Sequence, residues 1–291
     1  MLFNTLIKLV VVSVWFISMG WLIRFEAFPH VFDDNMQGYR ELAKHMPAMR
    51  DSWMKVMSGD QHVGYVNSAT EMTDFEGNEQ LVLTTQLIIR IDFQGELQLL
   101  RLNNEVKLDA KQELLGSSSS LSMGSFTGKL TLSPIDDSDK FELSAQLNEM
   151  EFKRQIDIPK GGVISSPFMD SSLRAVRKGR TVKIRSMDPF SPSADFRVVE
   201  VTGLSSSFQT LPGDSREVEV TRVEMKIGDL ILHAEVDEYG RIVRQETPFG
   251  ITFEISDASG AMKIPKTNAL NPASLLSSSA FPSLINLPEN L

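Results

Sequence analysis

The chain has 291 residues, of which 42% are hydrophobic and 23% charged, proportions typical of a globular protein rather than a disordered one. It contains no cysteine, which excludes disulfides, thiolate nucleophiles, zinc–sulfur sites and iron–sulfur clusters. The formal net charge of −9 argues against a nucleic-acid partner, because nucleic acids are bound through positively charged surfaces.

The first element is an apolar segment, Leu2 to Ile23, within residues 1–28, which we interpret as a single transmembrane helix. At ~1.5 Å per residue the segment spans roughly 33 Å, enough for a hydrocarbon core of ~30 Å. Lys8 lies near its start, where the long side chain can reach the headgroups. The residues expected to anchor the chain in lipid are Leu9, Val12, Trp15, Phe16, Trp21 and Leu22.

A cleaved signal peptide is the alternative, because the apolar run after Lys8 has a length that signal peptides also use. The small residues of a cleavage site are missing after this run, where residues 21–24 are Trp, Leu, Ile and Arg, so an uncleaved anchor is favoured. The flanking charges favour a short cytoplasmic N-terminus. We therefore expect a single-pass protein of the bacterial inner (cytoplasmic) membrane with its C-terminal domain in the periplasm or otherwise extracytoplasmic.

Residues 29–51 are predicted to form a helical connector. Apolar residues recur at helical spacing between Asn35 and Met46, Asp33 or Asp34 can cap the start, and Pro47 follows the end.

Residues 52–258 have the pattern of a β-rich domain. Leu87, Ile89, Ile91 and Phe93 alternate with other residues at a period of two, and similar runs recur between turns roughly every 8 to 15 residues. Turns are predicted at 94–95, 134–140 and 237–240. The pattern predicts a mainly β fold with one large, curved antiparallel sheet, an open half-barrel similar in architecture to periplasmic lipoprotein carriers.

One short helix is predicted inside the β-rich domain, from Ser166 to Lys178. Pro167 suits its first turn and Gly179 suits the position after its end. Beyond the domain, residues 259–291 combine Ser, Pro and Asn with scattered leucines and predict an extended or disordered tail. The alternative is that this tail docks on a partner or in a groove of the domain itself.

No catalytic, cofactor-binding or metal-binding residue is predicted. The serine runs, which we expect at strand edges and in linkers, contain no Gly-x-Ser-x-Gly elbow, and the four histidines lack the spacing of metal ligands. Asp136, Asp137 and Asp139 share one turn but lack the glycine and distal glutamate of a calcium loop. One basic run is a candidate contact for a partner protein or for lipid headgroups: Arg174, Arg177, Lys178 and Arg180.

From residue 52 onward the sequence resembles the extracytoplasmic β-rich domain found ahead of bacterial transglutaminase-like domains. The resemblance begins with Ser52, Trp53, Gly59, Gly64 and Tyr65, in the order Ser-Trp, strand, Gly turn and His-x-Gly-Tyr. It continues through 161–162, 171–174, 178–180 and 187–191 and ends with 236–256, so that it covers about residues 52–256. Because the chain lacks the cysteine that the transglutaminase reaction needs, the resemblance implies the accessory domain without the enzyme.

These observations predict a non-catalytic, membrane-anchored periplasmic accessory or scaffold subunit of a membrane or envelope complex, for example a transporter. Its expected partners are the lipid bilayer, through the N-terminal helix, and another membrane or envelope protein. The alternative is a periplasmic protein that binds a lipid or another hydrophobic ligand within its sheet.

Overall fold

The structure is a computed structural model. It describes residues 36–37, 49–75, 77–93, 95–111, 113–135, 140–158, 162–164, 176–187, 196–212, 216–227, 230–238, 240–248 and 250–272. The predicted transmembrane segment lies outside these residues. In the part of the chain that is described, no helix has the length and apolar character needed to cross a membrane.

Two runs of strands build the domain. The first run is β2 (Met49–Ser58), β3 (Gln61–Phe75), β4 (Asn78–Phe93), β5 (Glu96–Leu108), β6 (Leu114–Met123), β7 (Phe126–Pro134), β8 (Lys140–Leu147) and β9 (Met150–Asp157). The second run is β11 (Thr181–Met187), β12 (Phe196–Thr210), β13 (Glu217–Ile227), β14 (Leu230–Asp237), β15 (Ile242–Glu246) and β16 (Ile251–Ser256). The shorter elements are β1 (Met36–Gln37), β10 (Gly162–Ile164) and the helix α4 (Ala258–Met262).

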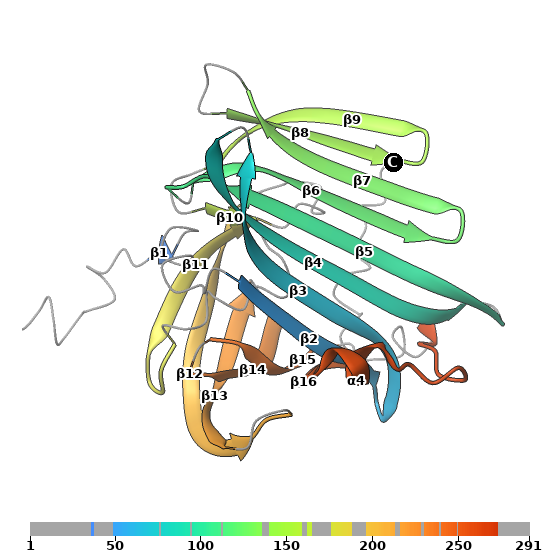
Figure 1. The fold of residues 1–291 in the computed structure, drawn as a ribbon, viewed down its shortest axis with the longest axis vertical. Coiled ribbons are helices and arrows are strands. Elements are labelled where there is room, and N and C mark those ends of the chain that lie inside the picture. The colour runs from blue at the N-terminus through green and yellow to red at the C-terminus, as the bar shows by residue number, and fades with distance from the viewer. Residues whose placement is uncertain are drawn as a thin grey trace, which may run out of the picture. The chain divides into compact units, whose positions relative to one another are not determined.

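The two runs form one open antiparallel sheet (Figure 1). Neighbours in sequence are neighbours in the sheet within each run, and the runs are joined where β16 pairs with β2, with Phe253 opposite Val56. The strand order is therefore β11 to β16 followed by β2 to β9, and β10 pairs with β11 in parallel. The prediction of a mainly β fold with a large, open antiparallel sheet is confirmed.

The main apolar cluster lies on one face of this sheet, which we call the inner face. Strands β2 to β5 and β11 to β16 all contribute buried side chains to it, so both runs share one core. The predicted alternation holds for Leu87, Ile89 and Ile91, which are buried, whereas Phe93 is exposed. Phe93 pairs with Glu96 at the tip of the β4–β5 hairpin, beyond the reach of the core.

The predicted turns join strands as expected. β4 ends and β5 begins around Gly95, β7 and β8 flank residues 135–139, and β14 and β15 flank the turn that starts at Asp237. Gly95 and Gly240 both have positive φ, at 86° and 80°, the conformation for which glycine is suited.

The predicted helix from Ser166 to Lys178 is wrong at its C-terminal end, and residues 165–175 lie outside the described part of the chain. Val176 and Arg177 are not helical, and Lys178 forms a parallel bridge with Gly203 of β12. The N–H of Gly179 donates to the carbonyl of Gly203 at 2.8 Å. Pairing with β12 thus uses backbone groups that a helix would need for itself.

Two further boundaries differ from expectation. Met36–Gln37 is a strand rather than part of the predicted connector helix, most of which is not described, and β2 begins at Met49 rather than after residue 51. The expected extended or disordered tail is ordered over its described part. Its first residues continue α4, in which Ala261 is buried, and Leu270 is buried against the sheet.

Candidate functional site

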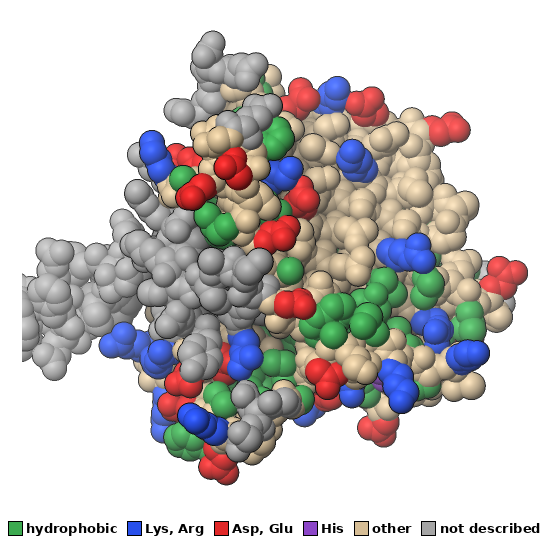
Figure 2. Space-filling view, viewed as in Figure 1, with side chains coloured by type: hydrophobic (Ala, Val, Ile, Leu, Met, Phe, Trp, Pro, Cys, Tyr) green, Lys and Arg blue, Asp and Glu red, His purple; other side chains and the backbone are tan. Residues whose placement is uncertain are grey.

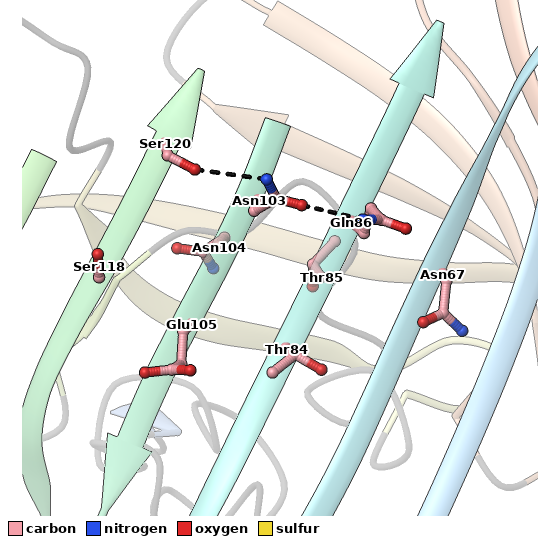
Figure 3. Close-up of a pocket in the computed structure, with 9 residues that line it drawn as sticks. All are labelled: Asn67, Thr84, Thr85, Gln86, Asn103, Asn104, Glu105, Ser118 and Ser120. Carbon is pink, nitrogen blue, oxygen red and sulfur yellow. Dashed lines mark hydrogen bonds between the residues drawn. The ribbon is translucent and has the colours of Figure 1, made fainter. Parts of the chain in front are cut away.

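An open trough of about 410 Å³ lies on the outer face of β3 to β6, opposite the apolar cluster. Amide and hydroxyl side chains line it, together with one carboxylate (Figure 3). The lining residues are Asn67, Thr84, Thr85, Gln86, Asn103, Asn104, Glu105, Ser118 and Ser120.

Sheet register explains why these polar groups meet. Asn67 of β3 lies opposite Gln86 of β4, Gln86 lies opposite Asn103 of β5, and Asn103 lies opposite Ser120 of β6. Directly opposite residues share a face, so four strands place four uncharged polar side chains in one row. We call Gln86, Asn103 and Ser120 the amide ladder.

Hydrogen bonds connect the members of the ladder across the strands. Nε2 of Gln86 donates to Oδ1 of Asn103 at 3.2 Å, and Nδ2 of Asn103 donates to Oγ of Ser120 at 3.4 Å (Figure 3). The neighbouring row of the same face holds Thr84, Glu105 and Ser118. Among the described residues that line the trough, Glu105 is the only charged one, and Nζ of Lys107 lies 3.3 Å from its carboxylate.

An aromatic pair borders the trough on β2 and β3. Trp53 lies opposite Asn67, and its ring centroid is 5.7 Å from that of Tyr65. Nε1 of Trp53 donates to Asp51 at 2.8 Å, and Nδ2 of Asn67 donates to the same carboxylate. Asp51 therefore fixes the indole and the first amide of the row relative to each other.

A second polar row crosses the same strands on the inner face, and two of its members, Thr85 and Asn104, also count among the residues that line the trough. Ser52, Ser68, Thr85, Asn104 and Ser119 are opposite one another in that order. Thr85 and Ser119 are buried, and Oγ of Ser119 donates to Oδ1 of Asn104 at 2.7 Å. A slip of one residue would move these groups to the outer face and bring polar side chains of the trough into the core, so the inner row helps to fix the register.

The outer face of the second run has a different chemistry. Across β13, β14, β15, β16 and β2, one row reads Arg222, Glu235, Arg244, Glu254 and Lys55, with alternating charge. Nη2 of Arg244 also lies 3.2 Å from Glu246. Figure 2 shows the contrast on the viewed face, where the area over β4 to β6 carries few charged side chains and apolar side chains gather beside it.

The trough has groups that can bind a ligand through hydrogen bonds. Its amides and hydroxyls donate and accept hydrogen bonds, and no histidine lines it. Among the residues that the structure describes, no three His, Asp or Glu side chains are grouped to hold a metal ion. His62, whose pKa is lowered by burial, lies on β3 and is not among the lining residues.

None of the residues singled out from the sequence is among the described residues that line the trough. Leu9, Val12, Trp15, Phe16, Trp21, Leu22 and Arg174 are outside the described residues. Arg177, Lys178 and Arg180 are exposed in the turn that leads into β11, whereas the trough belongs to β3 to β6.

Sequence reasoning did not find the trough. The serine run 117–120, expected in a strand edge or linker, lies within β6, where Ser117 and Ser119 are buried. The available signal was the equal spacing of Gln86, Asn103 and Ser120, which the β4–β5 and β5–β6 hairpins bring side by side.

A second surface feature is an exposed apolar strip at the tips of the β6–β7 and β8–β9 hairpins. Phe126, Leu147, Met150 and Phe152 are 37%, 45%, 70% and 56% exposed. They lie on the same face as the buried Leu130 and neighbouring core residues, because Leu130 pairs with Ala145 and Ala145 pairs with Phe152. The strip is thus the uncovered continuation of an apolar face.

Comparison with known proteins gives one structural likeness. No family model matches the chain, and no curated protein matches it. A DUF1089 family protein from Pseudomonas aeruginosa, known from a crystal structure, superposes with a TM-score of 0.34 at 16% sequence identity. The match covers 60% of this chain and 87% of that one.

Proposed function

We propose that this protein is a non-catalytic accessory or scaffold subunit of a membrane or envelope complex in bacteria, for example a transporter. The apolar N-terminal segment would anchor it in the inner membrane, with the sheet in the periplasm. The resemblance of residues 52–256 to the β-rich domain ahead of transglutaminase-like domains supports the same role. The structural observation that carries the proposal is the exposed apolar strip beside β9.

β9 is the last strand of the sheet and pairs only with β8 among the described strands. Its other edge presents backbone groups that an extended segment of another chain can pair with. Met150 and Phe152 project from β9 itself and are the most exposed members of the strip. An added strand would gain main-chain hydrogen bonds from β9 and apolar contacts from these two side chains.

The expected partner is therefore an extended protein segment with apolar side chains at alternate positions. Exposed apolar groups that cluster on one surface are typical of interaction sites, whereas single exposed ones are ordinary. Phe208 of β12, 69% exposed, provides a matched single residue outside the strip.

A photo-crosslinking amino acid at position 152 of the full-length protein in native membranes tests this proposal. The same amino acid at position 153, the next residue along β9, serves as the control because it points to the opposite face. We expect a protein adduct from 152 and not from 153. We also expect Met150→Arg to abolish the adduct and Phe208→Arg to leave it unchanged.

The other outcomes are equally informative. An adduct whose added mass is that of a lipid would overturn the scaffold role and support the alternative of a periplasmic lipid-binding protein. Equal crosslinking from 152 and 153, or an adduct that persists in Met150→Arg, would reject the strip as the docking surface.

A further inference from the structure

We propose that the trough on β3 to β6 binds a neutral saccharide, with its hydroxyl groups on the amide ladder and an apolar face of the sugar ring against Trp53. This site is separate from the apolar strip and does not depend on the partner proposed above.

The amide ladder has hydrogen-bond donors and acceptors that its internal bonds do not use. Its internal bonds use one N–H of Gln86, one N–H of Asn103 and one oxygen lone pair each of Asn103 and Ser120. A side-chain amide offers two N–H donors and a carbonyl with two lone pairs, and a hydroxyl both donates and accepts. In the bonds formed among the described residues, the second N–H of each amide and the carbonyl of Gln86 remain for a ligand. Sugar hydroxyls can use both kinds of group.

The shape and the neighbouring aromatic ring fit a sugar as well. A volume of about 410 Å³ falls in the range of about 300–1,000 Å³ that is usual for small-molecule sites. Trp53 lies in register with Asn67 at the border of the trough and is only partly buried. Its bond to Asp51 and its contact with Tyr65 hold the indole in place, which reduces the entropy lost when a ligand packs on it.

The near absence of charge selects against ionic ligands. The one carboxylate in the described lining, Glu105, is already paired with Lys107, and no lysine or arginine among these lining residues could attract a phosphate or an acidic polymer. A face that serves only for solubility usually mixes both signs of charge, as the row from Arg222 to Lys55 does on this same sheet. The neutral row is therefore a local departure from the chemistry of the rest of the face.

The backbone beneath the trough is held in one register. Ser52, Thr85 and Ser119 of the inner polar row are buried, as are the apolar core residues around them, so the four strands cannot slip without exposing buried side chains. The ladder is thereby preorganised on rigid strands, which is the arrangement that precise recognition requires.

The test measures binding of the full-length protein in detergent to immobilised neutral oligosaccharides built from hexoses or N-acetylhexosamines. The oligosaccharides are presented at a millimolar concentration. We expect at least one of them to bind, with an affinity that changes little between low and high salt, because the ligand is uncharged. Asn103→Ala should weaken binding about tenfold, the effect of removing one well-placed hydrogen-bonding group. Trp53→Leu should also weaken it, and Trp53→Phe should restore part of the loss.

Gln146→Ala is the matched control. Gln146 is an exposed amide on the same face, in β8, outside the trough, so its loss should leave binding unchanged. Asn103 is itself exposed, and Asn103→Ala should therefore unfold at the same urea concentration as the wild-type protein. Failure of every oligosaccharide to bind overturns the proposal. So does an equal loss in Gln146→Ala, or binding that high salt abolishes.

Discussion

Leu270 pairs in parallel with Ile91 of β4, two residues beyond Ile89, where the pairing of β4 with β3 stops at Gly64. The N–H of Leu270 donates to the carbonyl of Arg90 at 2.8 Å, and its carbonyl accepts from the N–H of Asp92 at 2.9 Å. The side chain of Leu270 is 3% exposed and belongs to the main apolar cluster. The segment after α4 is therefore part of the folded domain.

Leu270→Ala should lower the free energy of unfolding by about 3 kcal/mol, because it removes a buried side chain and leaves a cavity. Met262→Ala on α4 is the control. Met262 is exposed, so its replacement should change stability by less than about 0.5 kcal/mol. Urea unfolding of both variants measures the difference, and equal stabilities would show that the segment is not anchored by Leu270.

Gly64→Ala should destabilise the sheet by more than about 2 kcal/mol through overpacking. A Cβ at this position would lie 2.2 Å from the carbonyl oxygen of Ile88 and 2.9 Å from Cα of Ile89, and backbone atoms cannot move aside cheaply. At Gly128 the nearest atom is Cδ2 of Leu147, at 3.2 Å, which belongs to a flexible side chain. Gly128→Ala should therefore be close to neutral. A similar loss in both variants, measured by thermal unfolding, would contradict the assigned β3–β4 register.

Local structure was predictable from sequence where a single strand or turn determines it. The alternation of Leu87, Ile89 and Ile91 predicts both the strand and its buried face, and the glycine near the end of 237–240 predicts the hairpin turn. The pairing of β16 with β2 was not predictable, because the two strands come from opposite ends of the domain and no local pattern encodes their contact. The trough was missed for the same reason, since each of its residues alone is typical of a solvated strand.

Asp237→Ala should lower the free energy of unfolding by about 2 kcal/mol. This is less than the loss expected on breaking a fully buried ion pair, because the side chain of Arg241 is 28% exposed. The carboxylate of Asp237 is buried, accepts from the N–H of Arg241 at 2.8 Å and is ion-paired with its guanidinium across the β14–β15 turn. Asp237→Asn keeps a side-chain oxygen that can accept a hydrogen bond and should lower the free energy of unfolding by about half as much. A double-mutant cycle with Arg241→Ala measures the coupling, and additive losses would exclude a direct interaction.

Stability should fall as the solution is acidified through the titration of His62. Burial lowers the pKa of His62 below 6.5, although the bond from its ring to the carbonyl of Gly64, 2.8 Å long, opposes this. The unfolded chain therefore takes up the proton first, so the contribution of His62 is complete above about 6.5 and declines as the pH falls below it.

The variant His62→Gln keeps a donor for the carbonyl of Gly64 and cannot titrate. Its melting temperature should vary less with pH than that of the wild-type protein between about pH 8 and about pH 5, the range in which histidine changes charge. Parallel pH profiles for the two proteins would assign the acid sensitivity to other groups.

The place of β2 between β3 and β16 determines when the sheet can be completed. During synthesis, which proceeds from the N-terminus, β3 to β9 can pair in succession next to β2. The other edge of β2 stays unpaired until β16, the last of these strands in the sequence, has been made. Pairing between distant segments slows folding, and an unpaired edge attracts strands of other chains in the meantime. In the cell, one edge of β2 therefore has to be protected from pairing with other chains until nearly the whole domain has been synthesised.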